Sequence, residues 1–448
     1  MATSKQETGK STSRGLAFML RALSHRNYKL FFSGQSISLI GTWMTRIATS
    51  WLVYRLTGSA LLLGVVGFAG QIPSFLLAPF AGVLVDRWNR HRLLVATQVL
   101  ALLQSLALAI LALTGIVQIW HVIALSVFQG LINAFDMPAR QAFVVEMIEK
   151  RGDLANAIAL NSSMVNAARL LGPSIGGVII AAVGEGWCFM IDAISYLAVI
   201  ASLLAMKITP RMTKESKQTK MLQQLGEGFR YAIGFAPIRN VLLLLALVSL
   251  VGMPYTVLMP VFANEILHGG PNTLGLLMAA SGVGALAGAM LLAARKSVLG
   301  LGKYIPLTAG AFGAGLIAFS FSRVIWLSLL LMIVTGLGFM IQMAASNTVL
   351  QTIVDEDKRG RVMSFYMMAF MGTAPFGSLL AGSVAERIGA PHTLLFGGIG
   401  CIIGALWFAT SLPALRRDVR PIYVRIGIIP EMAAGIQNTS ELSVPPET

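Results

Sequence analysis

The sequence predicts an all-α integral membrane protein with twelve transmembrane helices, and three observations lead to this fold class. Hydrophobic residues make up 56% of the 448 residues and charged residues only 12%, so the chain is too apolar for a surface that faces water. Apolar runs of about 20 residues, the length that a helix needs to cross a hydrocarbon core about 30 Å thick, recur along the chain. Lys and Arg gather in alternate connections between these runs, as repeated membrane crossing requires.

The apolar runs are continuous, which favours helices over barrel strands of about ten residues with alternating polarity. The first six predicted spans are 30–56, 60–85, 93–117, 120–144, 154–183 and 186–206. The second six are 241–262, 274–294, 304–321, 325–349, 362–384 and 393–412.

The net charge is +15, from 34 Lys and Arg against 19 Asp and Glu, and its distribution indicates membrane orientation rather than nucleic-acid binding. The basic residues outside the inner connections are Arg55, Arg323 and Arg387 on the outer side and Arg46, Arg140 and Arg169 within spans. All the others lie on the side that holds both termini, which the positive-inside rule makes cytoplasmic. We expect a multi-pass protein of a bacterial-type inner membrane with both termini in the cytoplasm.

Residue spacing gives no sign of metal or nucleotide chemistry. Cys188 and Cys401 stand singly within predicted helices, and the five histidines lie at helix ends, so we expect no metal site and no cofactor. The glycine run from Gly282 to Gly288 follows no strand and belongs to no Walker-type sequence, which argues against the use of ATP.

A long connection divides the spans six and six. Its second part places Leu222, Leu225, Phe229 and Ile233 at helical spacing, which predicts a short amphipathic helix at the inner membrane surface. An ordinary solvated linker is the alternative. The predicted organisation is a basic tail 1–29, an N-terminal bundle 30–207, a linker 208–240, a C-terminal bundle 241–412 and a tail 413–448.

The two halves are related by a shift of 206 positions. This shift aligns Gly82 with Gly288, Trp120 with Trp326 and Gly130 with Gly336. The match of one tryptophan with another is informative because the chain has only seven of them. Duplicated six-helix halves are typical of transporters, in which two bundles rock about a central site.

The connection after the second span resembles the G-x-x-x-D-R-x-G-R-K/R signature of the major facilitator superfamily. The matching residues are Gly82, Asp86, Arg87 and Arg90, whereas Asn89 and His91 depart from the pattern. The resemblance implies the major facilitator fold, two pseudo-symmetric six-helix bundles, and a cytoplasmic charge network at the Asp and Arg that latches them. A basic loop that only orients the chain is the alternative.

Asp136 and Arg140 lie four residues apart near the cytoplasmic end of the fourth span and share one helix face. A local salt bridge explains them. We also expect them to join Asp86 and Arg87 in one inner gate network.

The fifth span contains a sequence that resembles the G-P-x-x-G-G core of the motif found in antiporter members of the superfamily. The matching residues are Gly172, Pro173, Gly176 and Gly177. The resemblance implies export rather than import, whereas an ordinary kinked packing helix would need the same residue types. Longer stretches, including 135–143 and 253–260, resemble the branch that contains enterobactin exporters and macrolide efflux proteins.

Few ionisable residues lie at membrane depth, and each is a candidate for function. Arg169 and Asp192 have similar predicted depths on neighbouring antiparallel spans, so we expect them to pair, in a structural or a gating role. Arg46 has no partner near it in sequence and is expected to attract anionic or carbonyl-rich cargo. Gln129 belongs to a Gln-Gly pair in the fourth span, but Ser126 stands where many proton-coupled relatives carry an Arg.

The sequence therefore predicts a secondary active transporter, not an enzyme, that exports small amphipathic molecules such as siderophores, macrolides or other drug-like compounds by alternating access. Proton antiport is the expected coupling. The expected partners are a small-molecule cargo and the lipid bilayer, with no nucleic acid and no ATP, and the chain is expected to act as a monomer. The alternatives are a lipid or lysolipid translocator on the same fold and a membrane sensor that transports nothing.

Overall fold

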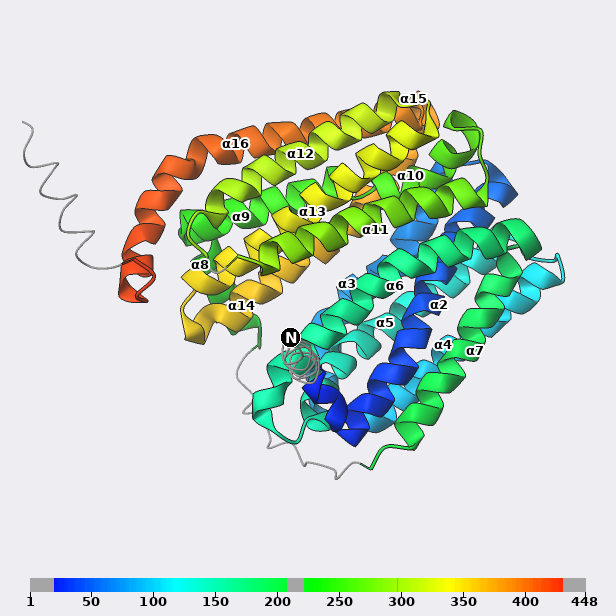
Figure 1. Cartoon of the computed structure of the whole chain (residues 1–448), viewed down its shortest axis with the longest axis horizontal. Helices are drawn as coiled ribbons and strands as arrows, with labels where there is room; N and C mark the ends of the chain where they lie inside the picture. Colours follow the sequence, from blue (N-terminus) through cyan, green and yellow to red (C-terminus); the bar gives the residue numbers. More distant parts are fainter. Residues whose placement is uncertain (1–19, 208–220, 296, 430–448) are drawn as a thin grey trace, which may run out of the picture.

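The computed structural model of the chain describes residues 20–207, 221–295 and 297–429. Every regular element in these residues is helical, and none of them forms a strand. The helices make two groups that follow each other in the chain, blue to green and green to red in Figure 1. The predicted all-α membrane fold is confirmed.

The N-terminal half consists of six long helices whose short connections make successive helices antiparallel. Local signals fix their ends: Gly58 takes a left-handed conformation (φ 61°) after the first helix, and the Ser59 side chain caps the second. Asn89, a departure from the family signature, caps the third helix by accepting a hydrogen bond from the Arg92 backbone N–H. The helices are α2 (Arg26–Thr57), α3 (Ala60–Arg87), α4 (Arg90–Leu113), α5 (Ile119–Met147), α6 (Leu154–Val183) and α7 (Glu185–Leu204). Short 3₁₀ turns precede α2 (η1, Arg21–Ser24) and α6 (η2, Arg151–Asp153).

The C-terminal half repeats this plan with two interrupted helices. One runs as α9 (Ala236–Leu247), the π-helical turn η3 (Val248–Gly252), α10 (Tyr255–Val261) and η4 (Phe262–Ile266). The other runs as α14 (Glu356–Met367), the π-helical turn η5 (Met368–Gly372) and α15 (Ala374–Ile388). Prolines follow the π turns at Pro254 and Pro375, and because proline removes a backbone donor it interrupts the regular ladder there. The unbroken helices are α11 (Pro271–Ala293), α12 (Leu301–Phe321), α13 (Ile325–Ile353) and α16 (Ala390–Arg425).

Eleven helical segments of the described residues are long and apolar enough to cross a membrane. The remaining member of the twelve is α2, which has 32 residues and packs against α6 and α7. This helix is less apolar than the other eleven because one of its faces is polar. The polar residues, which line a cavity described below, are Thr42, Thr45, Arg46, Thr49 and Ser50.

One helical segment lies where the linker helix was predicted, and another extends beyond its predicted limit. The linker contains a helix, α8 (Met221–Gly234), whose Phe229 ring lies 5.9 Å from that of Phe365 in α14, whereas residues 208–220 lie outside the described part. The last helix, α16, continues past residue 412 to Arg425. Hydropathy marks only its apolar part, and beyond it buried Leu415 and Val419 alternate with exposed Arg416 and Arg417.

The predicted repeat has a structural counterpart in the helix packing. Gly130 on α5 lies against the backbone of α3, where an added Cβ would be 2.7 Å from the Gly70 carbonyl oxygen. Its repeat partner Gly336 on α13 lies in the same way against α11, where an added Cβ would overlap the Ser281 carbonyl oxygen. The aligned glycines therefore serve the same close packing of helices in both halves.

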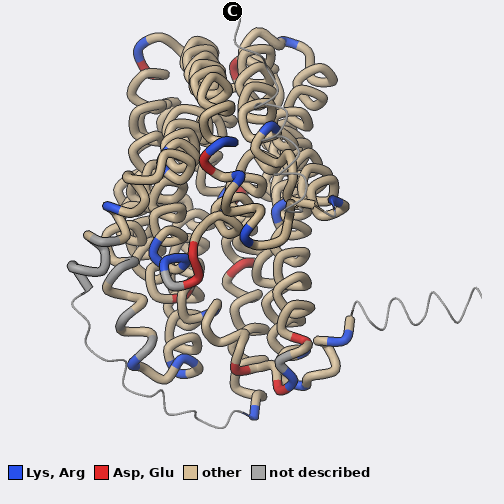
Figure 2. The backbone as a smooth tube through the Cα atoms, turned by 90° about the vertical axis from the view of Figure 1, so that its left-hand side faces the viewer, with Lys and Arg blue, Asp and Glu red and all other residues tan. Residues whose placement is uncertain are grey.

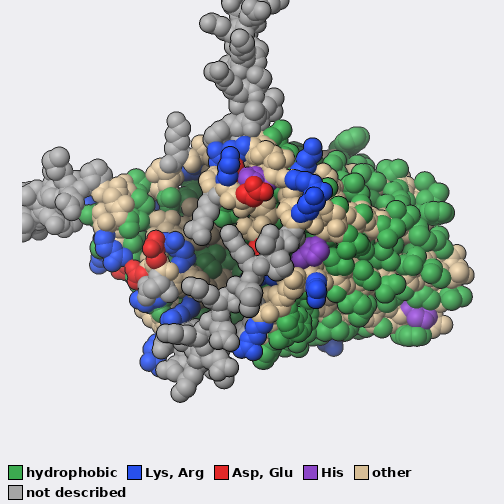
Figure 3. Space-filling view, turned by 90° about the horizontal axis from the view of Figure 1, so that it is seen from below, with side chains coloured by type: hydrophobic (Ala, Val, Ile, Leu, Met, Phe, Trp, Pro, Cys, Tyr) green, Lys and Arg blue, Asp and Glu red, His purple; other side chains and the backbone are tan. Residues whose placement is uncertain are grey.

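The two halves meet at one end of the molecule and diverge at the other, as Figure 1 shows at the upper right and lower left. We call the meeting end the closed end; it holds the connections α2–α3, α6–α7 and α15–α16. The opposite end, here the basic end, holds the start of α2, the α3–α4 connection and the end of α16. Figure 2 views the charged positions from the left-hand side of Figure 1. Figure 3 shows hydrophobic side chains over the right-hand part of one face, and charged side chains towards its left.

Candidate functional site

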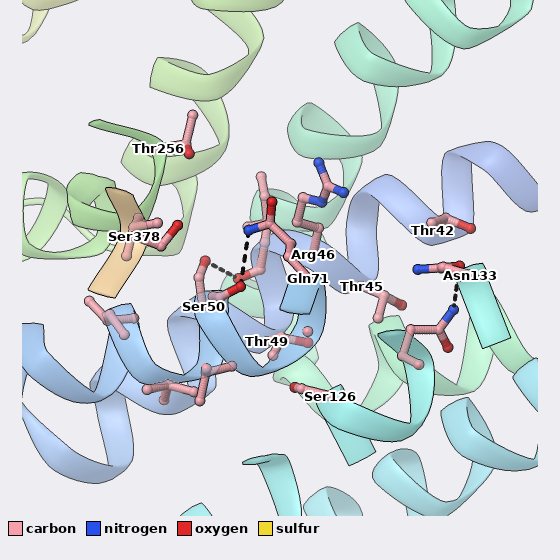
Figure 4. A pocket seen from close by; sticks show the side chains of 18 of the residues that line it. Thr42, Thr45, Arg46, Thr49, Ser50, Gln71, Ser126, Asn133, Thr256 and Ser378 are labelled. Atoms are coloured by element: carbon pink, nitrogen blue, oxygen red, sulfur yellow. Dashed lines mark hydrogen bonds between the residues drawn. The ribbon is translucent and has the colours of Figure 1, made fainter. Parts of the chain in front are cut away.

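A cavity of about 300 Å³ lies between the two halves. It is lined by α2, α3, α4, α5 and α7 on one side. On the other side it is lined by α10, α11, α15 and the residues Met253 and Pro254 between η3 and α10. Figure 4 shows Arg46, Gln71 and Ser50 from the N-terminal half, with Thr256 and Ser378 of the C-terminal half to the left. The size is at the lower end of that of cavities for drug-sized ligands.

The cavity wall combines hydroxyls, amides and apolar side chains. Its charged lining residues are Arg46 and Asp192, and both belong to the N-terminal half. The C-terminal half contributes Met253 and Met278, whose flexible thioether chains adapt to differently shaped apolar groups. Gln129 lines the cavity, and its amide donates to Asn133 Oδ1 at 3.1 Å.

Two pairs of glycines join the halves at the closed end. A Cβ added to Gly64 of α3 would lie 3.0 Å from the Gly382 Cα of α15, and a Cβ added to Gly177 of α6 would lie 3.0 Å from the Gly275 Cα of α11. Backbone atoms cannot turn away as a side chain can, so these contacts need residues without a side chain. The glycine pairs bring backbone against backbone and close the cavity at this end.

Hydrogen bonds between the halves supplement the glycine pairs. The Ser59 hydroxyl and the Leu61 backbone N–H both donate to Glu386 Oε2 at 3.0 Å. The Tyr54 hydroxyl donates to Glu265 Oε1 at 2.6 Å. These bonds connect α2 and the start of α3 with the C-terminal half at the closed end.

The four residues of the predicted kink motif divide between two neighbours. Gly172 and Gly176 lie against α2, where a Cβ at Gly172 would be 2.5 Å from the Trp43 Cβ. Gly177 lies on the other side, against α11, and the Pro173 carbonyl oxygen is the atom nearest to a Cβ added at Gly275, at 2.7 Å. The motif thus holds α6 within its own half and also forms part of the closed end.

Asp192 of α7 is 2% exposed and lines the cavity. Its Oδ2 accepts hydrogen bonds from Thr45 at 2.9 Å and from Ser105 at 3.1 Å, whereas its Oδ1 has no hydrogen-bond partner among the described residues. No described basic residue forms an ion pair with it. A buried carboxylate held only by hydroxyls is poorly compensated when charged.

The predicted pair of Arg169 with Asp192 is not formed in the structure. The carboxylate of Asp192 faces Thr45 on α2 and Ser105 on α4. The Arg169 guanidinium instead lies over the Trp43 ring, 5.8 Å from its centroid, and Arg46 lies over the same ring at 4.7 Å. The similar predicted depths of Arg169 and Asp192 in the membrane did not mean that their side chains point toward one another.

The predicted salt bridge between Asp136 and Arg140 is present, as an i, i+4 pair on α5. Asp136 also accepts hydrogen bonds from Thr97 at 2.9 Å and from Gln98 at 2.7 Å, both on α4. These contacts fix α4 against α5 inside one half. A role of this pair in a gate remains a prediction.

The signature connection stands at the basic end. Arg87 is exposed there, and Arg90 forms an ion pair with Glu146 at 2.7 Å. A Cβ added at Gly82 would have no neighbouring atom within 4 Å. The side chain of Asp86 lies outside the described part. The predicted latch of Asp86 and Arg87 with Asp136 and Arg140 therefore stays a prediction.

A second ionic cluster connects elements of the C-terminal half at the basic end. Asp355 pairs with Arg425 at 2.9 Å and with Lys358 at 3.5 Å. The hydrogen bond from Arg425 is the main cause that lowers the pKa of Asp355 below its usual value. A lowered pKa means that the stabilisation is present above the ordinary pKa of the carboxyl group and is lost only as the pH falls through the lowered value. Because the groups are partly exposed, we expect the contribution to be small and constant near neutral pH.

Comparison with known proteins identifies the fold and the family. The profile of the transmembrane secretion effector family, a major facilitator family, matches residues 18–423. The chain belongs to this family.

Curated relatives of this chain share about a quarter of its residues over nearly their whole length. The staphyloferrin A transporter of Staphylococcus aureus is 27% identical over 87% of this chain and 98% of its own. The multidrug efflux pump Tap of Mycolicibacterium fortuitum is 27% identical over 84% of this chain and 93% of its own. The macrolide efflux protein A of Streptococcus pyogenes is 24% identical over 84% of this chain and 94% of its own.

Solved structures agree on the fold. A bacterial homologue of the human lysosomal transporter Spinster, in an inward-facing and unoccupied conformation, superposes with a TM-score of 0.70 at 14% identity and covers 88% of this chain and 98% of its own. The nucleoside transporter NupG has a TM-score of 0.64 at 14% identity, over 86% of this chain and 98% of its own. The predicted superfamily and branch are confirmed, and the chain is a multi-pass membrane transporter.

Several cavity residues were not selected from the sequence. These residues are Gln71, Met253, Thr256, Met278 and Ser378. Met253 and Thr256 lie in the stretch 253–260, which carried the family resemblance but was not assigned to a site, and the other three belong to no motif. The signal that points to the cavity is the unusually polar face of α2, because polar residues of a membrane helix turn away from lipid.

Proposed function

We propose that this protein is a secondary active exporter of small amphipathic molecules that works by alternating access. The observation that carries the proposal is the cavity between two six-helix halves that backbone contacts close at one end. The excess of Lys and Arg at the basic end supports a cytoplasmic position for that end and for both termini. In this orientation the structure corresponds to the state that receives cargo from the cytoplasm.

The chemistry of the wall supports an amphipathic cargo. Hydroxyl and amide groups such as Thr42, Ser50 and Gln71 offer hydrogen bonds, and the methionines of the C-terminal half offer adaptable apolar contact. Relatives named for a siderophore, for multiple drugs and for macrolides support the class of small drug-like or siderophore-like molecules.

We further propose that proton antiport drives export, with Asp192 as the group that takes up and releases the proton. Asp192 is the carboxylate among the residues that line the cavity. In the described residues it has no ion pair that would hold it permanently charged. Its free Oδ1 gives a proton a place to bind.

The proposal is tested by accumulation of fluorescent dyes, macrolides and catecholate siderophores in cells that lack their own pumps. We expect cells that produce the protein to accumulate at least one compound several-fold less than cells with an empty vector, because export removes it against its gradient. A protonophore is expected to abolish the difference.

As a control, the protein is extracted from the membrane fraction with detergent. Its elution profile in gel filtration then shows whether it is folded. Equal accumulation of every compound in the presence of folded protein would contradict export. In that case, translocation of fluorescent lysolipids in the same cells would test the lipid alternative.

A further inference from the structure

Two arginines of the N-terminal half share one aromatic ring at membrane depth. The Cζ atoms of Arg46 on α2 and Arg169 on α6 lie 4.7 Å and 5.8 Å from the centroid of Trp43. In the described part of the chain, no carboxylate forms an ion pair with either guanidinium. The carboxylate of the cavity wall, Asp192, is held by hydroxyls of Thr45 and Ser105.

The position of the ring is fixed by the close approach of α2 and α6. Gly172 of α6 leaves room for Trp43, because a Cβ at Gly172 would be 2.5 Å from the Trp43 Cβ and 2.9 Å from the Ile40 carbonyl oxygen. The ring in turn provides a negative face for cations. Trp43 therefore fixes where the two guanidinium groups lie.

The arrangement has an excess of positive charge. Arg46 and Arg169 interact electrostatically with each other, and two like charges at this depth repel more strongly than they would in water. A charge inside a membrane protein normally has a partner of opposite sign or faces a water-filled cavity. Arg46 is exposed and lines the cavity, so its donors are accessible to a molecule within it, whereas Arg169 is half-buried and is not among the lining residues.

We propose that Arg46 binds an anionic group of the transported molecule, a carboxylate or a phosphate, that Arg169 adds a second positive charge near this contact, and that Trp43 positions the two guanidinium groups. A guanidinium offers two parallel N–H donors that match the oxygens of either anion. The anion compensates the repulsion between the two arginines. The rest of the cargo then extends towards the methionines and hydroxyls of the C-terminal half.

The inference assigns a substrate class to the cavity and in that respect rests on the proposed function, but binding is measured without transport. Purified full-length protein in a neutral maltoside detergent is titrated by calorimetry at constant ionic strength. The carboxylate probe is citrate, with its neutral trimethyl ester as the matched ligand. The lipid probe is lysophosphatidate, with zwitterionic lysophosphatidylcholine as the matched ligand.

We expect at least one of the two anions to bind, and its matched ligand to bind at least about tenfold more weakly. Arg46→Gln is expected to weaken binding of that anion about tenfold, since it removes a charge-assisted contact. Arg169→Gln is expected to weaken it several-fold, since it removes a nearby positive charge. Trp43→Leu is expected to weaken it less, because the charges remain but lose their fixed position. Arg46→Lys is expected to retain part of the affinity, which shows that a folded variant is being measured.

Arg323→Gln is the matched control, because Arg323 is an exposed arginine at the closed end that donates to the Ser320 and Ser322 carbonyl oxygens. It is expected to bind like the wild type. Binding of citrate alone identifies a soluble cargo, and binding of lysophosphatidate alone identifies a lipid headgroup. Absence of binding for both anions, or binding that Arg46→Gln and Arg169→Gln leave unchanged, would overturn the inference.

The same experiment separates this inference from the proposed function. Export without anion binding would leave the exporter intact and remove the anion site. Anion binding that depends on both arginines, in a protein that lowers the accumulation of no compound, would retain the site and remove export.

Discussion

Replacement of Gly177 by valine is expected to reduce transport to below about a tenth of the wild-type rate. The added Cβ would lie 2.8 Å from the Pro271 carbonyl oxygen and 3.0 Å from the Gly275 Cα, both backbone atoms of α11. Overpacking of this kind costs roughly 1–3 kcal/mol. The cost falls on the state in which α6 and α11 touch, so the equilibrium between states shifts about tenfold or more away from the closed arrangement.

The shift is measured with spin labels on the two halves. Ile116 and Val324 are 61% and 56% exposed and lie in closed-end connections of different halves. Labels on cysteines at these positions, in a chain without Cys188 and Cys401, are expected to move apart in Gly177→Val. Gly310→Ala is the control for a helical glycine replacement, since its added Cβ meets only the Ala405 Cβ at 3.8 Å. Unchanged distances and full transport in Gly177→Val would contradict the role of the glycine pairs.

Replacement of Asp192 by asparagine is expected to abolish accumulation against a gradient while exchange down a gradient continues. Asparagine keeps the shape and can still accept hydrogen bonds from Thr45 and Ser105, but it cannot gain or lose a proton. Loss of the coupling group removes the proton-driven step, so uphill transport is expected to fall by a factor of about ten or more. Proteoliposomes with an imposed pH gradient measure the uphill step, and preloaded vesicles without a gradient measure exchange.

Asp418→Asn is the matched control for this experiment. Asp418 is an exposed carboxylate of α16, outside the cavity, and its variant is expected to transport like the wild type. Uphill transport that survives in Asp192→Asn would assign the proton to another group or the driving force to another ion.

The membrane spans were predictable because the hydrophobicity of each residue can be followed along the chain without knowledge of its contacts. Apolar runs and the basic bias of alternate connections reflect what a helix in lipid requires. The alignment of Gly130 with Gly336 reflects what two helices in close contact require. The close packing of α6 was predictable for a similar reason, since residues as small as Gly172 and Gly176 allow a neighbouring helix to approach. The end of α16 was not, because beyond residue 412 its helix is stabilised by packing of Leu415 and Val419 rather than by lipid.

The pairing of side chains across helices required the structure. Depth placed Arg169 near Asp192, but the rotation of α6 about its axis directs the arginine to Trp43. Likewise, the sequence marked Gly177 as a residue of a motif without showing that its neighbour is Gly275 in the other half. The cavity residues Met253 and Met278 have ordinary identities, and only the position of a π-helical turn and of α11 brings them to the wall.

The confinement of the charged cavity residues to the N-terminal half has a consequence for energetics. In the proposed alternating access, Arg46 and Asp192 would move with that half, whereas the C-terminal half contributes no charged residue to the described lining of the cavity. A charge displaced through the whole membrane field is worth about 2.3 kcal/mol per 100 mV. Membrane voltage therefore acts on the transition through the N-terminal half, and the electrical work of one cycle depends on how far Arg46, Asp192 and any bound ion travel along the field.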